Sequence, residues 1–375
     1  MARQDDGDAG SNRPVRILGL IEWGLGHRTH GMNLGRAAQG LEDIDVTWHR
    51  LAAPTARAWC PDWTSNWTTQ SGLMAGRYIH DARRSSATDI VFCHSYVPAV
   101  LGRSQLGRLP LVVSIDATPL QIDQMDGYEH SAGPATLERF KHLVVRRCFD
   151  RAVHVLAVSD WAKTGLVDGY GVPEDKITTI PFGVQIDRFV RPEGRQRNRS
   201  DVTRLLFVGG EFDRKGGPLL LSVFDELRSR HRIELDIVTD DAISVPPGVR
   251  VHTGLDPLSP ELIECFHSAD VFCLPSRGDC MPLVLAEAAA AGLPAVCTRV
   301  GATAELVGHD DTGVLVDVDD RRQLAHAIEQ LVVDLDRRAA MSARAVTRAR
   351  TVFDSRTNGE RTLALLRDLA RGRRR

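Results

Sequence analysis

Two carboxylates, Asp279 and Glu287, follow a short apolar run in the C-terminal half of the chain. The run at 271–274 predicts a buried strand, and the segment after Pro282 predicts a helix. If most of the intervening chain is helical, the two carboxyl groups lie roughly 12 Å apart. That is too far for a pair that flanks one scissile bond. The spacing fits the two ends of one elongated ligand, and it fits equally a loop carboxylate followed by an ordinary surface glutamate.

The loop after Asp279 enters the predicted helix through Cys280, Met281, Pro282 and Leu283. The first turn of a helix exposes unpaired backbone N–H groups and the positive end of the helix dipole, which suit a diphosphate. In open parallel sheets, ligands bind at the carboxyl ends of the strands. The segment therefore predicts a phosphate-binding site.

Basic residues follow a second apolar run, at 204–208. Gly209 and Gly210 come directly after the run, and Arg214 and Lys215 stand just before another helical pattern. Glycine lets the backbone approach a ligand closely, and a lysine beside a helix N-terminus can neutralise a diphosphate. The alternative is a solvated basic pair in a turn.

The N-terminal half has a glycine-rich loop that contains Gly26, His27 and Arg28. Its spacing is not that of a dinucleotide-binding loop, so the three residues either touch phosphates or form an exposed polar loop. Two other candidates, Asp116 and His94, each end a predicted strand. Asp116 either orients a hydroxyl group or caps the next turn. His94 belongs either to a site or to the structural core.

We predict no metal site and no cofactor. Asp317 and Asp319 have the D-x-D spacing of some metal sites, but they directly precede a predicted helix at 323–333. Asp319 or Asp320 is therefore expected to cap that helix. No other carboxylate or histidine cluster has the spacing of metal ligands. The seven cysteines include no C-x-x-C pair and fit reduced thiols.

The elements that must position these residues alternate between strand and helix. Short apolar runs predict buried parallel strands at 15–21, 90–93, 111–115, 153–158, 204–208, 235–238, 271–274, 295–297 and 314–316. Apolar residues at three-to-four spacing predict helices at 29–39, 137–149, 219–230, 261–269, 283–291 and 323–333. The alternation predicts an α/β fold with parallel sheets covered on both faces.

A polar stretch at 191–201 interrupts this alternation and predicts a linker. We therefore expect a disordered N-terminal segment at 1–14, a Rossmann-like domain at 15–190, and a second one at 202–350. A C-terminal helix and basic tail at 351–375 would pack on either domain, including back on the first.

The charge balance, 47 basic against 49 acidic residues, gives no support to a nucleic-acid-binding protein. No run of 18 apolar residues and no secretory signal is found, which favours a cytoplasmic protein. Five of the last nine residues are arginine, as in a solvated tail or a weak contact with an anionic membrane.

The segment 137–151 and a group of tryptophans each allow two interpretations. The segment 137–151 either rests on a membrane or is ordinarily solvated, because it mixes apolar residues with Arg139, Lys141, Arg146 and Arg147. A tryptophan stripe faces either a ligand or a core or interface; its members are Trp59, Trp63 and Trp67.

Several stretches resemble the signature segments of glycosyltransferase family 4. They are 207–217, 275–288, 301–307, 312–316 and parts of 158–184. The resemblance is close over about 153–333 and loose in the N-terminal half. It implies two Rossmann-like doubly wound domains that face each other across a cleft, the GT-B fold. It also implies sugar transfer from a nucleotide-sugar with retention of configuration.

The resemblance further implies residue roles. Glu287 would hold the ribose hydroxyls, and Asp279, where most members have glutamate, would contact the donor sugar. Lys215 would bind the diphosphate, and Asp116 stands near the place where many members have a histidine. The implied catalytic residues are Asp279, Lys215 and Asp116. The implied donor-binding residues are Gly26, His27, Gly209, Gly210, Arg214, Lys215, Asp279, Cys280, Met281, Pro282, Leu283 and Glu287.

The resulting interpretation is a metal-independent hexosyltransferase that uses a UDP- or GDP-sugar and an unidentified acceptor. Two alternatives share the same fold class. One is a nucleotide-sugar epimerase, which would need further acid and base side chains around the sugar. The other is a non-catalytic protein that binds sugar nucleotides.

Overall fold

The computed structural model describes residues 13–52, 67–85, 87–128, 133–192 and 202–372. Several sequence-based expectations lie outside these residues: nearly all of the N-terminal segment 1–14, most of the linker 191–201, Trp59, Trp63 and the last three arginines.

Six parallel strands form the sheet of the N-terminal half, in the order β2-β1-β3-β4-β5-β6. They are β1 (Val15–Glu22), β2 (Ile44–Leu51), β3 (Ile90–His94), β4 (Leu111–Ile115), β5 (His154–Ala157) and β6 (Ile177–Thr179). The direction of strand addition reverses between β1 and β3, which creates a topological switch point there.

The C-terminal half repeats this plan with the order β12-β11-β10-β7-β8-β9. Its strands are β7 (Thr203–Val208), β8 (Ile233–Val238), β9 (Val249–His252), β10 (Val271–Leu274), β11 (Ala295–Thr298) and β12 (Gly313–Val316). Here the switch point lies between β7 and β10.

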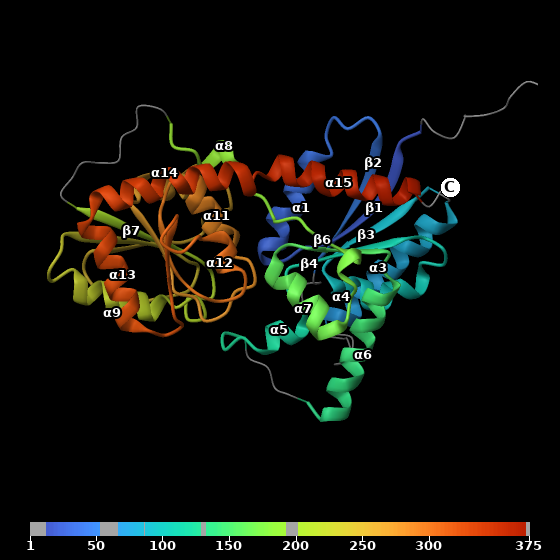
Figure 1. Ribbon diagram of the computed structural model, residues 1–375, viewed down its shortest axis with the longest axis horizontal. Coiled ribbons are helices and arrows are strands. Elements are labelled where there is room, and N and C mark those ends of the chain that lie inside the picture. Colours follow the sequence, from blue (N-terminus) through green and yellow to red (C-terminus); the bar gives the residue numbers. More distant parts are fainter. Residues whose placement is uncertain (1–12, 53–66, 86, 129–132, 193–201, 373–375) are drawn as a thin grey trace, which may run out of the picture.

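Helices cover both sheets (Figure 1). In the N-terminal half they are α1 (Leu25–Ala37), α3 (Trp67–Arg84), α4 (Tyr96–Gly102), α5 (Pro119–Asp123), α6 (Ala135–Arg151) and α7 (Asp160–Tyr170). The others are α8 (Ile186–Phe189), α9 (Gly217–Leu227), α10 (Pro260–Ser268), α11 (Leu283–Ala290), α12 (Thr303–Leu306), α13 (Arg321–Val333), α14 (Leu335–Val352) and α15 (Ser355–Gly372).

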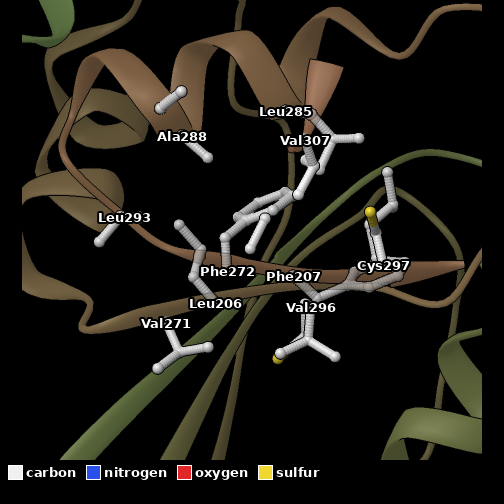
Figure 2. Close-up of a cluster of buried hydrophobic side chains, with 14 of the residues drawn as sticks. Leu206, Phe207, Val271, Phe272, Leu285, Ala288, Leu293, Val296, Cys297 and Val307 are labelled. Carbon is white, nitrogen blue, oxygen red and sulfur yellow. The ribbon is translucent and has the colours of Figure 1, made fainter. Parts of the chain in front are cut away.

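The N-terminal sheet is apolar on both faces. Along β1, Leu18 and Leu20 pack into one buried cluster, while Ile17 and Ile21 pack into the other. This is the period of two expected of a strand. The buried apolar residues of the C-terminal half form one cluster in which Phe272, Phe207 and Leu206 lie close together (Figure 2). The predicted α/β class with two doubly wound sheets is confirmed.

Three strands were not predicted from the sequence: β2, β6 and β9. The edge strand β2 is exposed or half-buried at six of its eight positions and carries Asp45, His49 and Arg50, so no apolar run marks it. The strands β6 and β9 also lie at edges of their sheets and are short. An edge strand has a neighbour on one side alone, so its sequence need not be continuously apolar.

The chain crosses between the halves at two adjacent places. The N–H of Val184 donates to the carbonyl of Phe353 at 2.8 Å, and the N–H of Ser355 donates to the carbonyl of Val184 at 3.0 Å. Beyond the first crossing, Ile186 and Phe189 of α8 already pack into the core of the C-terminal half, ahead of the expected linker at 191–201.

After the second crossing, α15 lies along the N-terminal half (Figure 1). It packs on α1, where an added Cβ at Gly359 would come within 2.5 Å of the Ala37 Cβ. Arg367 also bonds to Asp43 at 3.0 Å. The last helix therefore connects the C-terminal half to the N-terminal one.

Candidate functional site

The candidate residues of the C-terminal half lie at the switch point. The loop after β7 carries Gly209, Gly210, Arg214 and Lys215, and the loop after β10 carries Asp279. Because β7 and β10 are neighbours, their loops leave the same edge of the sheet side by side. The local fold thus brings together residues that are some sixty positions apart in sequence.

Lys215 and Asp279 form an ion pair. The Nζ–Oδ2 distance is 2.6 Å, and the two side chains are 13% and 11% exposed. Removing one partner would leave a charge almost without water, a large cost. The lysine predicted to bind phosphate is therefore engaged by the carboxylate predicted to contact the sugar.

Arg214 connects the two loops and also reaches the other half of the molecule. Its Nε lies 2.7 Å from the Glu211 carboxylate, and its Nη1 donates to the carbonyl of Gly278. Its guanidinium group also lies over the ring of Tyr128, 4.8 Å from the centroid. Tyr128 belongs to the loop after α5, in the N-terminal half.

Two glycines shape the loop after β7. An added Cβ at Gly209 would come within 3.2 Å of the Lys215 side chain, and one at Gly216 would lie 1.9 Å from the carbonyl oxygen of Pro275. Gly216 also has a φ of 76°, which an L side chain rarely adopts. Gly210 has open space around it. The missing side chain at Gly216 therefore lets the two loops pack closely against each other.

Glu287 lies half-buried on α11, and burial raises the pKa of its carboxyl group to about 7. Within the described residues its side chain has no hydrogen bond or ion pair. A buried carboxylate without a partner is costly and marks a candidate ligand contact.

The stretch between Asp279 and α11 presents backbone rather than side chains. The side chains of Cys280, Met281 and Leu283 are each 8% exposed, and Pro282 is buried as the N-cap of α11. Backbone N–H groups of Cys280 and Met281 find no acceptor in the described part of the chain. Any ligand at this site therefore meets the peptide groups.

The glycine-rich loop predicted in the N-terminal half is instead helical. Helix α1 begins at Leu25, four residues before the predicted start, so Gly26, His27 and Arg28 lie in its first turn. Gly24 supplies the extended N-cap, with φ −142° and ψ 155°. The early start has a reason: His27 bonds to His94, and that bond holds the first turn against the sheet.

Three candidates of the N-terminal half come together. The Nδ1 of His27 lies 2.8 Å from the Nε2 of His94, and the Nε2 of His27 lies 3.7 Å from the Asp116 carboxylate. His94 is fully buried at the end of β3, and burial holds its pKa well below the usual range.

The other residues singled out in the sequence make ordinary structural contacts. Asp320 caps α13 by accepting from the N–H of Gln323 at 2.8 Å, and Asp319 pairs with Arg277 at 2.9 Å. Trp67 donates its ring N–H to Glu22. Among the described residues no group of three or more His, Cys, Asp or Glu could hold a metal ion. No described helix is both long and apolar enough to cross a bilayer.

Sequence reasoning missed the contacts that join the halves. The carboxylate of Glu305 accepts from the N–H groups of Asp160 and Trp161 at 2.8 and 2.7 Å, at the start of α7. Gly127 lies against Gly278, where an added Cβ would come within 2.7 Å of the Gly278 nitrogen. A carboxylate at a helix N-terminus is a known pairing, but nothing in the sequence indicates that it comes from the other half.

Two surface cavities lie away from these residues. One, of about 710 Å³, is lined by Arg83, Asp89, Arg108 and Ala370 among others, and one of about 610 Å³ lies between α3 and α4. Neither cavity is lined by a candidate residue.

Two doubly wound parallel sheets, one in each half, form the architecture of the GT-B glycosyltransferases. Family models agree: Glycosyltransferase Family 4 matches residues 26–188, and Glycosyl transferases group 1 matches residues 202–334. The chain belongs to the family 4-like glycosyltransferases.

Curated relatives support this assignment. The D-inositol 3-phosphate glycosyltransferase of Kineococcus radiotolerans is 30% identical over 329 residues, which cover 78% of this chain and 74% of the relative. The D-inositol 3-phosphate glycosyltransferase of Pseudarthrobacter chlorophenolicus is 29% identical to this chain. The match covers 72% of this chain and 68% of the relative.

Among solved structures, sucrose-phosphate synthase from Thermosynechococcus elongatus superposes with a TM-score of 0.75 at 16% identity, over 96% of this chain and all of its own. HepE from Anabaena, solved with UDP and glucose, superposes with a TM-score of 0.70 at 15% identity, over 94% of this chain and 100% of its own.

Proposed function

We propose that this glycosyltransferase transfers a hexose from a nucleotide-diphosphate sugar to a hydroxyl group of its acceptor, with retention of configuration. The observation that carries the proposal is the juxtaposition of Lys215 and Asp279 at the switch point of the C-terminal sheet. A buried lysine beside a helix start suits a diphosphate, and ligands of such sheets bind at this edge.

The donor lies along the carboxyl edge of the C-terminal sheet in this proposal. Glu287 accepts hydrogen bonds from the two ribose hydroxyls, and it is free to do so because its carboxylate has no partner within the described residues. The diphosphate lies between Lys215 and the amides of Cys280 and Met281. Asp279 then exchanges its lysine for hydroxyl groups of the donor sugar.

The proposed catalytic roles follow from the negative charge that develops on the leaving group. As the bond between the sugar and the diphosphate breaks, negative charge grows on the leaving phosphate oxygen. Lys215 and Arg214 stabilise that charge, and such stabilisation is usually the largest catalytic contribution. No cofactor is needed, since the nucleotide itself is the leaving group. Asp116, on the other wall, orients a hydroxyl group of the reacting sugars.

The similar proteins suggest which donors and acceptors to test first. HepE was solved with UDP-glucose, so UDP-sugars are the first donors to test, followed by GDP-sugars. Many relatives are D-inositol 3-phosphate glycosyltransferases, so D-inositol 3-phosphate is the first acceptor to test. Both choices rest on similarity, and the acceptor is otherwise open.

A thermal-shift panel of UDP-, GDP-, ADP- and TDP-sugars tests the proposal. A preferred donor raises the melting temperature, and Glu287→Ala abolishes the rise. The matched control is Glu261→Ala, because Glu261 is an exposed glutamate on α10 of the same half. No rise with any nucleotide-sugar would contradict the proposal.

Product analysis then tests the reaction itself. NMR of the product gives its anomeric configuration, and an inverted product would contradict retention. An altered free sugar nucleotide without transfer would instead identify an epimerase. Binding without turnover across an acceptor panel would identify a non-catalytic protein.

We also propose a weak peripheral contact between α6 and an anionic membrane on the cytoplasmic side. Leu137, Phe140 and Leu143 are 46%, 61% and 41% exposed. They share α6 with the exposed side chains of Arg146 and Arg147, and α6 projects from the N-terminal half (Figure 1). Exposed apolar and basic side chains on one helix favour binding to the surface of an anionic membrane.

Vesicle sedimentation tests this contact. The protein should pellet with vesicles of phosphatidylcholine and phosphatidylglycerol more than with phosphatidylcholine alone, and Phe140→Ser should remove the difference. Leu335→Ser is the matched control, because Leu335 is 59% exposed on α14 of the other half. Equal sedimentation of the protein and its Phe140→Ser variant would contradict the contact.

A further inference from the structure

We propose that His94 positions His27, so that the Nε2–H of His27 and the Asp116 carboxylate together bind one hydroxyl group of a sugar-like ligand. The inference rests on the proposed function for the identity of that ligand. Its first part, the role of His94, concerns the free protein alone. In this role His94 is a positioning residue, since it acts through His27.

The burial of His94 limits its protonation. It is fully buried at the end of β3, and burial together with its two histidine neighbours holds its pKa well below the usual range. A neutral imidazole carries one N–H. The Nε2 of His94 lies 2.8 Å from the Nδ1 of His27, so one of these two nitrogens carries the shared proton.

The surroundings decide which nitrogen carries it. The other ring nitrogen of His94, Nδ1, is buried and has no partner within the described residues. If the proton stood there, the molecule would bury an N–H without an acceptor, at a cost of about 1–3 kcal/mol. A bare nitrogen lone pair is tolerated more readily in such a place. The proton of His94 therefore lies on Nε2 and is donated to His27.

This arrangement fixes the tautomer of His27. Its Nδ1 accepts from His94, so in the neutral ring the proton lies on Nε2. That Nε2–H lies 3.7 Å from the Asp116 carboxylate oxygen. The opposite tautomer would direct a lone pair at a carboxylate. The buried His94 thus determines which ring nitrogen of the partly exposed His27 carries a proton toward Asp116.

The distance between His27 and Asp116 indicates which chemical group can bind between them. At 3.7 Å the two atoms are too far apart for a direct hydrogen bond. One oxygen atom about 2.8 Å from each nonetheless fits beside them. A hydroxyl group can accept from the N–H and donate to the carboxylate at once. A phosphate would be repelled by Asp116, and an ammonium group would find the N–H of His27 directed at it.

Neighbouring rings hold the cluster in place. His30 lies 4.7 Å from His94 between ring centroids, and burial lowers its pKa to about 3, so it is neutral. Phe182 lies 4.2 Å from His30 and 5.3 Å from His94. The side chains of His27 and Asp116 are 21% and 24% exposed, so a ligand can reach them while His94 stays fixed.

Nitrogen-15 NMR of the imidazole rings tests the role of His94 without any substrate. In histidine-labelled protein at pH 8.5, His27 should show the tautomer with the proton on Nε2. Assignment of its resonance comes from the His27→Gln variant. A proton on Nδ1 of His27 would overturn the inference even if every His94 variant failed to fold.

Two substitutions of His94 give the matched comparison. His94→Gln places an amide N–H about where Nε2 stands, whereas His94→Leu supplies no donor. The Leu variant should show a mixture of His27 tautomers, and the Gln variant should keep the single one. Melting temperatures separate this effect from general destabilisation. A single tautomer in both folded variants would contradict a positioning role.

Ligand titration tests the hydroxyl site. UDP-glucose, GDP-mannose and D-inositol 3-phosphate are each added, and the His27 Nε2 resonance is followed. A probe that binds should move it, and Asp116→Asn should reduce that movement at least about threefold. Binding, seen as a rise in melting temperature, without any change at His27 would overturn the hydroxyl site.

The two levels of the proposal fail in distinguishable ways. If neither these probes nor any nucleotide-sugar of the thermal-shift panel binds, the proposed function and the hydroxyl site are contradicted together. The tautomer of His27 would still decide the role of His94. If the probes bind and react but His27 is unaffected, the proposed function stands and this inference falls.

Discussion

The two halves of the molecule hold their candidate polar groups in different ways. On the C-terminal side, Lys215 pairs with Asp279 at 2.6 Å and Arg214 pairs with Glu211 at 2.7 Å. On the N-terminal side, the nearest counterpart is His27 at 3.7 Å from Asp116. One half holds its charged groups in close ion pairs, whereas the other holds imidazole rings and one carboxylate with a gap between His27 and Asp116.

The difference indicates what each side is suited to bind. A lysine already paired with a carboxylate can exchange that partner for a phosphate without an unpaired charge ever being buried. A neutral N–H beside a carboxylate offers one donor and one acceptor, which is what a hydroxyl group needs. The four predictions below test this contrast, beginning with the largest expected effect.

The Lys215→Met variant removes the cation of the paired side. We expect the transfer rate at saturating donor to fall by about 100–1,000-fold, because a positioned charge at the leaving group is lost. We also expect a loss of stability of about 3 kcal/mol, because Asp279 is left unpaired.

The double variant Lys215→Met/Asp279→Asn should regain the stability but not the rate. Stability is measured by urea unfolding and rate by product formation. Lys163→Met is the control, since Lys163 pairs with an exposed glutamate, Glu174, at 2.8 Å. A normal transfer rate in the Lys215→Met variant would contradict a role for the C-terminal charges in binding phosphate.

Glu287→Gln tests the unpaired carboxylate of the same side. We expect nucleotide affinity to fall by about 30–100-fold, because a charged acceptor of two hydrogen bonds is lost. Since burial raises the pKa of Glu287 to about 7, the charge destabilises the free protein at pH 8. The variant should therefore be more stable there, by an amount on the order of 2 kcal/mol, and this gain should vanish near pH 4.

Unfolding at the two pH values measures the gain, and calorimetry with UDP-glucose measures affinity. Glu261→Gln serves as the comparison on the same half. If Glu287→Gln lost stability at pH 8 and kept its affinity, the carboxylate would have a purely structural role.

The pH dependence of nucleotide affinity follows from the same group. The free carboxyl group is mostly protonated below about pH 7, and a protonated carboxyl group is a poorer acceptor. UDP-glucose affinity should therefore fall about tenfold between pH 8 and pH 6. The diphosphate of a nucleotide-sugar does not titrate there, so Glu287→Gln should have a flat profile. An unchanged slope in that variant would assign the effect to another group.

The smallest effect concerns the contact between the two sides. Tyr128 lies under the Arg214 guanidinium at 4.8 Å, which contributes about 0.5–1 kcal/mol. Tyr128→Leu should raise the donor KM by about two- to fivefold. Tyr128→Phe keeps the ring and should change it less than twofold. Equal effects of Leu and Phe would indicate that the hydroxyl group is what matters.

The strands that position the site could be predicted because they are buried on both faces. The runs at 205–208 and 271–274 are continuously apolar, and they end where the loops with the candidate residues begin. The edge strand β2 could not be predicted, because its exposed positions carry polar residues.

The residues of the C-terminal side were predicted from short stretches of chain, whereas the contacts between distant segments were not. His27 and His94 are 67 positions apart, and Tyr128 and Arg214 are 86 apart. Such contacts depend on how distant segments pack together, which no local pattern encodes. The start of α1 was placed four residues late for the same reason, since its first turn is held by a residue of β3.

The paired backbone crossings at Val184 and Ser355 limit how the halves can move. Twisting one half about the connection would pull apart the two hydrogen bonds between these segments. Bending across them would leave both bonds intact. Gly183 adds to this restriction, because an added Cβ there would lie 2.3 Å from the Ser355 Cα. The two adjacent crossings therefore resist a twist of one half against the other.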